Sequence, residues 1–398
     1  MTNLFKISGG EFVVLSSSSQ MMPGRQTISD FLRTCVTRGD VPCVVASVAT
    51  AADLLYLEAF GKSAVGSNID ATPDTIFGLA SMTKPVTSLA AMMLVDEGRI
   101  SLDAPLTHYL ADYLQPPVLT KLNPDGTYES RPARRSILIR DLLAHTSGIS
   151  YSFLNPALAR LSERGTPETA LPLLHDPGAG WAYGPSTAIL GRIVAAVSGE
   201  TLDDFCKTRI FDSLGMADTG YVVPAEKHPR VVTQHNRNSE GTLLERPNPP
   251  KIQSRGRGDD GLFSTASDYV AFLQLFLNSG RCGSTHLISE SALRMMMSNQ
   301  IGNLVVDVLL ATNRSLARPF PLGARKDKFG FGFQIETEPS DPEMRSPGSL
   351  SWAGIFNTYF WIDPLKELAA VVMMQLLPGN DEKAVDLFRG FERLVYAG

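Results

Sequence analysis

The chain has 398 residues, of which 43% are hydrophobic and 19% are charged, and its formal net charge is −5 at pH 7. This composition is that of an ordinary globular protein and excludes a disordered, collagen-like or coiled-coil chain. The small acidic excess argues against a protein that neutralises nucleic-acid or lipid phosphates, because such proteins usually carry a strong basic excess. A domain size of about 150 residues suggests two or three domains, and one elaborate domain is the alternative.

The first hundred residues predict a helix, a β-hairpin and a second helix. Residues 1–25 show little periodicity and are expected to form a loose leader. Apolar residues recur at helical spacing over 27–39, and strand-like runs follow at 44–48 and 54–60. A strongly apolar helical face then covers 86–98, where a glycine ends it.

The middle of the chain predicts short helices and long loops. Residues 101–180 hold short helical pieces that prolines repeatedly interrupt. Helical periodicity returns over 186–198, and a Pro/Gly-rich stretch at 246–261 precedes a helix at 268–277.

The end of the chain regains strand character. Three runs at 329–335, 352–362 and 368–376 predict strands, with a turn at 363–366 between the last two. A helix with one apolar face follows over 384–394.

Strands at both ends of a helical middle indicate one sheet shared by the two ends of the chain, with a helical insertion. We therefore expect a discontinuous α/β domain of residues 26–100 plus 290–398. Residues 101–289 form a largely helical domain with long loops, and 1–25 precede both.

The four cysteines are scattered without a C-x-x-C pair, so free, buried thiols are expected. No secretory signal pattern and no run of about 20 apolar residues is present in the sequence. We expect a soluble cytoplasmic protein that binds neither a membrane nor a nucleic acid.

Several common catalytic motifs are missing from the sequence, including G-x-S-x-G, G-x-x-x-x-G-K-[ST], G-x-G-x-x-G and H-E-x-x-H. The six histidines are isolated from one another, so no metal site and no cofactor is expected. His145 lies at a predicted helix end, where a cation would attract the terminal carbonyl groups, and a structural role is favoured over a catalytic one.

Ser81 and Lys84 are the candidate nucleophile and base. They open the most apolar helix of the chain, with Pro85 in its first turn. Residues i and i+3 share a helix face, so the Lys84 amine can reach the Ser81 hydroxyl. A helix start also offers free N–H groups to a developing oxyanion. Removal of the serine proton by a lysine requires a third polar group nearby. Tyr183 is a candidate, and the alternative is a packed tyrosine with a satisfied hydroxyl.

Three motifs in this order resemble the serine β-lactamase and penicillin-binding-protein superfamily. They are Ser81-x-x-Lys84 at a helix start, Tyr183 after a Pro-Gly pair and a tryptophan, and Trp352-Ala353-Gly354 on a late strand. The nearest branch is the class C β-lactamase-like esterases, called family VIII carboxylesterases. The resemblance runs from about Ile28 to Val395. It implies an α+β fold of the β-lactamase/transpeptidase type, with an antiparallel sheet flanked by helices and an inserted helical domain.

The resemblance also implies roles for individual residues. Ser81 would be the nucleophile, Lys84 the base or proton shuttle, and Tyr183 its partner. The backbone N–H groups of Ser81 and Ile355 would form the oxyanion hole. Trp352, Ala353 and Gly354 would line the substrate pocket.

Two departures from the β-lactamase pattern bear on activity. Pro185 stands where β-lactamases have asparagine, and Trp352 stands where they have the lysine that meets the substrate carboxylate. Both missing groups bind a polar, anionic β-lactam, so the site should favour neutral, apolar esters. Trp352 could also be ordinary strand packing. Arg255 and Arg257 lie near Asp259 and Asp260 in a loop that the resemblance places beside the pocket, and the sequence assigns the two arginines no role.

These features predict a cofactor-free serine carboxylesterase. It would hydrolyse small-molecule, short-chain esters through an acyl-enzyme intermediate, with weak β-lactam hydrolysis as a side activity. The alternatives are a β-lactamase or D-amino-acid peptidase, an acyltransferase to a bulky alcohol, and a non-catalytic penicillin-binding-like module. The sequence leaves the oligomeric state open.

Overall fold

A computed structural model describes residues 24–246, 256–320, 323–338 and 344–397, together with 5–6, 12–13 and 22. Most of the predicted leader and part of the Pro/Gly-rich stretch at 246–261 lie outside the described residues. The helices are α1 (Arg25–Thr37), α2 (Thr83–Asp96), α3 (Ile139–Leu143), α4 (Pro156–Glu163), α5 (Ser186–Ser198), α6 (Leu202–Cys206), α7 (Asp212–Leu214), α8 (Ala266–Leu277), α9 (Glu290–Met297) and α10 (Glu382–Tyr396).

The strands include many short pairs besides the main sheet. They are β1 (Phe5–Lys6), β2 (Phe12–Val13), β3 (Cys43–Ala49), β4 (Leu54–Gly61), β5 (Phe77–Gly78), β6 (Val118–Leu122), β7 (Tyr128–Arg131), β8 (Gln234–Arg237), β9 (Leu243–Arg246), β10 (Phe263–Ser264), β11 (Arg281–Cys282), β12 (Thr285–His286), β13 (Lys328–Phe329), β14 (Gln334–Ile335), β15 (Leu350–Gly354), β16 (Thr358–Asp363), β17 (Leu368–Met373) and β18 (Leu376–Leu377).

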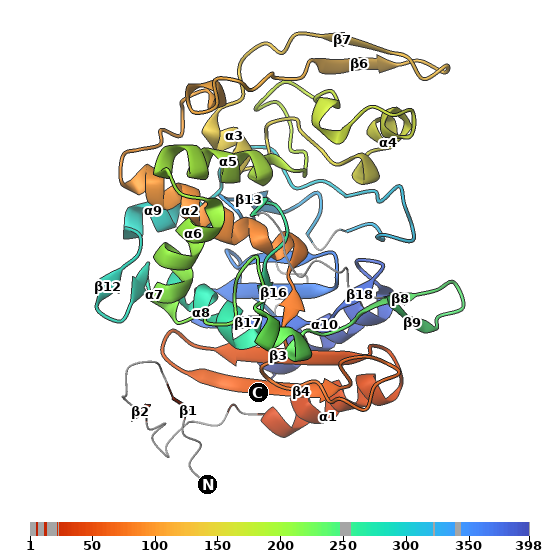
Figure 1. Ribbon diagram of the computed structural model, residues 1–398, viewed down its shortest axis with the longest axis vertical. Helices are drawn as coiled ribbons and strands as arrows, with labels where there is room; N and C mark the ends of the chain where they lie inside the picture. The colour runs from red at the N-terminus through yellow and green to blue at the C-terminus, as the bar shows by residue number, and fades with distance from the viewer. Residues whose placement is uncertain are drawn as a thin grey trace.

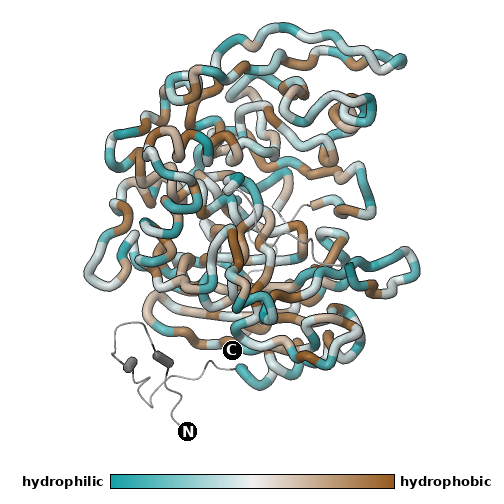
Figure 2. The backbone as a smooth tube through the Cα atoms, in the orientation of Figure 1, coloured by the Kyte–Doolittle hydropathy of each residue, from teal (hydrophilic) through white to brown (hydrophobic). Residues whose placement is uncertain are grey.

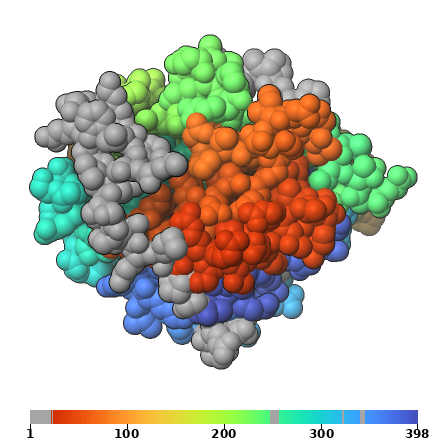
Figure 3. All heavy atoms as spheres, turned by 90° about the horizontal axis from the view of Figure 1, so that it is seen from below, coloured from red at the N-terminus to blue at the C-terminus, as the bar shows by residue number. Residues whose placement is uncertain are grey.

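The main sheet has the order β13-β14-β15-β16-β17-β3-β4, and each neighbouring pair is antiparallel. The β17–β3 pair joins the two ends of the chain, because Val371 lies opposite Ser47. Figures 1 and 3 show the N-terminal segments, in red and orange, beside the C-terminal segments, in blue. The predicted antiparallel sheet shared by the two ends of the chain is confirmed.

Successive side chains of a strand point to opposite faces, and here the two faces enter different parts of the core. Val44, Ala46 and Val48 of β3 pack in one cluster with apolar residues of α1 and α10. Val45 packs in the other cluster, which includes residues of α2 and α8. Helices therefore cover both faces of the sheet. Figure 2 shows hydrophobic segments gathered in the middle of the molecule, whereas the outlying β8–β9 hairpin is mostly hydrophilic.

Helix α2 is the central helix of the structure. Every residue from Thr83 to Leu94 is buried, and the helix packs against α5, α6 and α9. Helix α8 packs on β17 and β3, although the sequence division places it within residues 101–289. A helix that is apolar all round must be buried on all sides, and these contacts provide that burial.

Two predicted strands differ from the structure in their boundaries. The run at 352–362 is a hairpin, because β15 ends at Gly354 and β16 begins at Thr358. Asn357 makes this turn with a φ of 61°. The run at 329–335 contains two short strands that residues 330–333 separate. The apolar pattern continues through the first of these turns, so the sequence did not reveal it.

The cysteines are free, and three of them, Cys35, Cys43 and Cys206, are buried, whereas Cys282 is partly exposed. Within the described part of the chain, no helix is both long and apolar enough to cross a membrane.

Candidate active site

Ser81 lies in a tight 3-10 turn, Ala80–Met82, that leads from β5 into α2. Ala80 has a φ of 46°, a left-handed conformation that is strained for a residue with a side chain and that often occurs at functional sites. The Tyr269 hydroxyl of α8 donates a hydrogen bond to the Met82 carbonyl at 2.8 Å. The neighbouring helix therefore holds the end of this turn in place.

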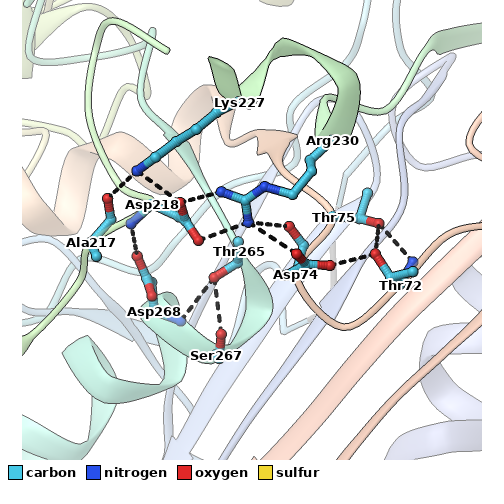
Figure 4. Close-up of polar contacts among 10 residues, drawn as sticks. All are labelled: Thr72, Asp74, Thr75, Ala217, Asp218, Lys227, Arg230, Thr265, Ser267 and Asp268. Atoms are coloured by element: carbon cyan, nitrogen blue, oxygen red, sulfur yellow. Dashed lines mark hydrogen bonds and ion pairs between the residues drawn. The ribbon is translucent and has the colours of Figure 1, made fainter. Parts of the chain in front are cut away.

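A network of polar side chains fixes the segment that approaches Ser81 (Figure 4). Arg230 donates to the Asp74 carbonyl at 3.0 Å and pairs with Asp218. Asp268 of α8 accepts a hydrogen bond from the Asp218 backbone N–H at 2.8 Å. The Arg230 hydrogen bond lowers the pKa of Asp218 below its usual value. The segment before β5 and the start of α8 are thus joined through one ion-pair network.

Lys84 is a buried polar group of the site, with only 1% of its surface exposed. Its Nζ lies 3.1 Å from the Ser81 Oγ, 3.1 Å from the Tyr151 hydroxyl and 2.8 Å from the Asp259 backbone carbonyl. An ammonium group has three N–H donors, so these three partners account for all of them. The structure thus brings together Ser81 and Lys84, as the i, i+3 spacing predicted.

Tyr183 also lies at the site, but its hydroxyl has another partner. The Lys84 Nζ is 4.9 Å from the centre of the Tyr183 ring, and the Trp352 Nε1–H donates to the Tyr183 hydroxyl at 3.2 Å. The phenol that hydrogen-bonds Lys84 is that of Tyr151. The catalytic role of Tyr183 therefore stays a prediction, and Tyr151 is a second candidate that the sequence analysis missed.

Asp259 connects to this group from a loop. Its Oδ2 accepts a hydrogen bond from the Tyr151 hydroxyl at 2.7 Å, and Arg257 pairs with it at 3.2 Å. Burial, followed by the nearby Asp259, raises the pKa of Tyr151 well above its ordinary value. Gly258 has a φ of 83°, and a Cβ there would lie 2.5 Å from the Thr187 carbonyl oxygen. Glycine therefore lets this loop approach α5 closely enough to place Asp259.

The sequence offers only weak signals for these two residues. Tyr151 follows a His-Thr-Ser-Gly phrase, and Asp259 is the first of two aspartates after a glycine. Neither pattern predicts a contact with Lys84, because that contact depends on how the middle of the chain folds over α2.

His145 is buried behind the site among aromatic rings. Burial, with a further contribution from Lys84, lowers its pKa to about 3, so the imidazole is neutral at pH 7. Its ring centre lies 4.9 Å from that of Tyr183 and 5.4 Å from that of Phe329. The expected position after a helix is confirmed, since α3 ends at Leu143. The expected charged contact with helix carbonyls is wrong, because the ring carries no charge.

A cavity of about 200 Å³ opens beside Ser81. Trp352, Ala353 and Gly354, the predicted pocket residues, all line it. Its other walls include apolar, polar and charged side chains, among them Tyr151, Phe153, Leu154, Tyr183, Leu309, Phe320, Arg257, Asp259, Asp260 and Arg318. Among the described residues, Arg318 has no carboxylate within ion-pair distance.

The two residues of the predicted oxyanion hole, Ser81 and Ile355, both lie at this cavity. Neither Ser81 nor Ile355 donates its N–H to an acceptor in the described ranges. Gly354 allows the end of β15 to lie close to the backbone at Leu79, because a Cβ on residue 354 would collide with the Leu79 carbonyl oxygen. The oxyanion hole stays a prediction.

No group of three His, Cys, Asp or Glu side chains within the described residues is arranged to hold a metal ion.

Comparisons with known proteins agree with this arrangement. The sequence pattern of the family named Beta-lactamase matches residues 28–394. The chain is 30% identical over 346 residues to the monacolin J acid methylbutanoyltransferase of Aspergillus terreus. This match covers 81% of this chain and 82% of that protein. It is 30% identical over 349 residues to the lovastatin esterase of Penicillium rubens, with 81% and 85% covered.

Among solved structures, the unliganded simvastatin synthase LovD of Aspergillus terreus has a TM-score of 0.81 and 27% identity, over 94% of this chain and 98% of that chain. The antiparallel sheet with its flanking helices is therefore the β-lactamase-like fold. The chain belongs to the beta-lactamase family and is an enzyme of the serine hydrolase type.

Proposed function

We propose that the protein is a serine carboxylesterase of the family VIII kind, which hydrolyses short-chain esters through an acyl-enzyme intermediate. The observation that carries this proposal is the 3.1 Å hydrogen bond between the buried Lys84 Nζ and the Ser81 Oγ at the cavity wall. A serine hydroxyl is a poor nucleophile until a neighbouring base accepts its proton, and this amine is in position to do so.

The reaction has two steps. Ser81 Oγ attacks the ester carbonyl while Lys84 accepts the hydroxyl proton, and the N–H groups of Ser81 and Ile355 stabilise the oxyanion. Lys84 then gives the proton to the leaving alcohol. In the second step, water attacks the acyl-enzyme with the same residues as base and acid, and the acid leaves. Tyr183 and Tyr151 are the candidate partners of the lysine.

The size and lining of the cavity support a small, apolar acyl group. Its volume of about 200 Å³ is below the ~300–1,000 Å³ that is usual for drug-sized ligands. Phe153, Leu154, Leu309, Phe320 and Trp352 supply apolar walls. The lovastatin esterase among the relatives supports ester hydrolysis, although its substrate is named for that protein alone.

The proposal is tested with p-nitrophenyl butyrate and nitrocefin, using wild type and Ser81→Ala. We expect fast ester turnover that falls at least about 1,000-fold in Ser81→Ala, because the nucleophile is removed. Ser213→Ala, at an exposed serine outside the cavity, is the matched control and should keep wild-type activity. Rapid nitrocefin turnover with negligible ester cleavage would favour a β-lactamase. Full ester activity in Ser81→Ala would overturn the nucleophile assignment.

A second candidate is acyl transfer to an alcohol that carries a carboxylate. The observation that favours it is Arg318, a cavity residue whose guanidinium donates to the Arg314 carbonyl oxygen and has no carboxylate partner among the described residues. The name of one relative, monacolin J acid methylbutanoyltransferase, describes the transfer of an acyl group to an acid. Product analysis with a competing hydroxy acid separates the candidates, since an esterase releases free acid and a transferase forms a new ester.

A further inference from the structure

The direction of each hydrogen bond around Lys84 follows from the groups that surround it. A backbone carbonyl can only accept, so Lys84 must donate to the Asp259 carbonyl, at 2.8 Å. A phenol has one hydroxyl proton, and Tyr151 donates it to the buried Asp259 carboxylate, 2.7 Å away. Tyr151 therefore presents only a lone pair to Lys84, 3.1 Å away, and accepts a second N–H from it.

These two bonds determine where a neutral Lys84 places its lone pair. The neutral amine has two N–H groups and one lone pair, and both N–H groups are already donated. The remaining direction points to the Ser81 Oγ at 3.1 Å. We propose that Asp259 is a positioning residue that orients the Tyr151 hydroxyl, and through it the lone pair of Lys84 toward the nucleophile. This inference rests on the proposed esterase function.

The proton count of the acylation step agrees with this arrangement. The Oγ–H proton of Ser81 moves to the Lys84 lone pair while the bond from Oγ to the acyl carbon forms. Lys84 then has three N–H groups, of which two keep their acceptors and the third faces the reacting oxygens. That third proton passes to the leaving alcohol oxygen when the carbon–oxygen bond of the ester breaks. Asp259 neither gains nor loses a proton.

The burial of Asp259 argues that it does more than hold the loop. Its side chain is 1% exposed, whereas that of its ion-pair partner Arg257 is 61% exposed. An ion pair with so exposed a guanidinium does not require a buried carboxylate, and surface pairs contribute little to stability. The buried contact of Asp259 is the Tyr151 hydroxyl, which in turn reaches Lys84.

Asp259→Asn tests the inference. The amide can donate to the Tyr151 oxygen and turn the phenol proton toward Lys84, where it competes with Ser81 for the lone pair. We expect kcat for p-nitrophenyl butyrate to fall about 10- to 100-fold, as for the loss of one charge-assisted hydrogen bond, with KM changed less than about 3-fold. Asp327→Asn is the matched control, because Asp327 is also buried and accepts a side-chain hydrogen bond, from Gln334, outside the cavity.

A double-mutant cycle with Tyr151→Phe separates positioning from a general loss of structure. If Asp259 acts through the Tyr151 hydroxyl, Asp259→Asn should lower kcat less than about 3-fold in the Tyr151→Phe background. If the two substitutions lower kcat in the double variant by the full product of their separate effects, the inference is overturned. An unchanged kcat in Asp259→Asn or in Tyr151→Phe would overturn it as well. The second single variant keeps the test decisive if Asp259→Asn does not fold. A wild-type protein without ester turnover would instead refute the proposed function.

Discussion

Replacing His145 with glutamine is expected to flatten the dependence of stability on pH below neutrality. In the folded protein the pKa of His145 is lowered from 6.5 to about 3, chiefly by burial. Between these values the unfolded chain binds a proton that the folded chain does not. The contribution of the neutral His145 to stability is therefore fully present above pH 6.5 and is lost as the pH falls toward 3.

The two pKa values determine the magnitude. Each pH unit between them changes the free energy of unfolding by about 1.4 kcal/mol. From pH 7 to pH 5 the protonation of His145 in the unfolded chain should cost about 2 kcal/mol. Other groups titrate over the same range, so the quantity to compare is the difference in slope between wild type and His145→Gln.

Urea unfolding at pH 7, 6 and 5 measures these slopes. Wild type should lose about 2 kcal/mol more than His145→Gln between pH 7 and pH 5. His286→Gln, which removes an exposed imidazole, is the control for loss of any histidine. Equal slopes in wild type and His145→Gln would refute the reasoning. If the variant does not fold, the imidazole NMR resonances of wild type at pH 5 decide the matter, because a protonated His145 would contradict the effect of burial.

Two further substitutions test the surroundings of the site. Trp352→Phe keeps an aromatic wall but removes the indole donor to the Tyr183 hydroxyl. It should lower kcat/KM for p-nitrophenyl butyrate about 3- to 10-fold. An unchanged kcat/KM would mean that the indole serves only as a wall of the cavity. Gly258→Ala should destabilise the protein by at least about 2 kcal/mol in urea unfolding, because a Cβ would meet the Thr187 carbonyl. Gly215→Ala, at a φ of 68° with open space for the Cβ, should cost only about 1 kcal/mol; equal losses at the two glycines would contradict the steric argument.

The sequence predicts local structure and the contact between Ser81 and Lys84 well, because both depend on near neighbours. The helices α2, α5, α8 and α10 follow from apolar spacing that their own residues supply. Ser81 and Lys84 are three residues apart, so their contact follows from the helix itself. The hairpin at Gly354–Thr358 was missed because an apolar run continues through its turn.

The contacts of Lys84 with Tyr151 and Asp259 could not be predicted in the same way. These residues lie 67 and 175 positions after Lys84 in the chain. Their approach depends on the fold of the middle of the chain and on the close contact that Gly258 allows. Tyr183 illustrates the same limit, since its motif correctly brings it to the site but does not tell which group its hydroxyl contacts.

The residues around the cavity come from three separate parts of the chain. Ser81 and Lys84 come from the N-terminal third, Tyr151 and Asp259 from the middle, and Ile355 from the β15–β16 turn. Tyr151, Asp259 and Ile355 thus meet Ser81 at the cavity only when all three parts have packed together. The contact between Ser81 and Lys84 depends only on α2 and the 3-10 turn before it, whereas the proposed orientation of the Lys84 lone pair requires the complete fold. We therefore expect local damage to the Asp259 loop to lower turnover while ester binding is largely retained.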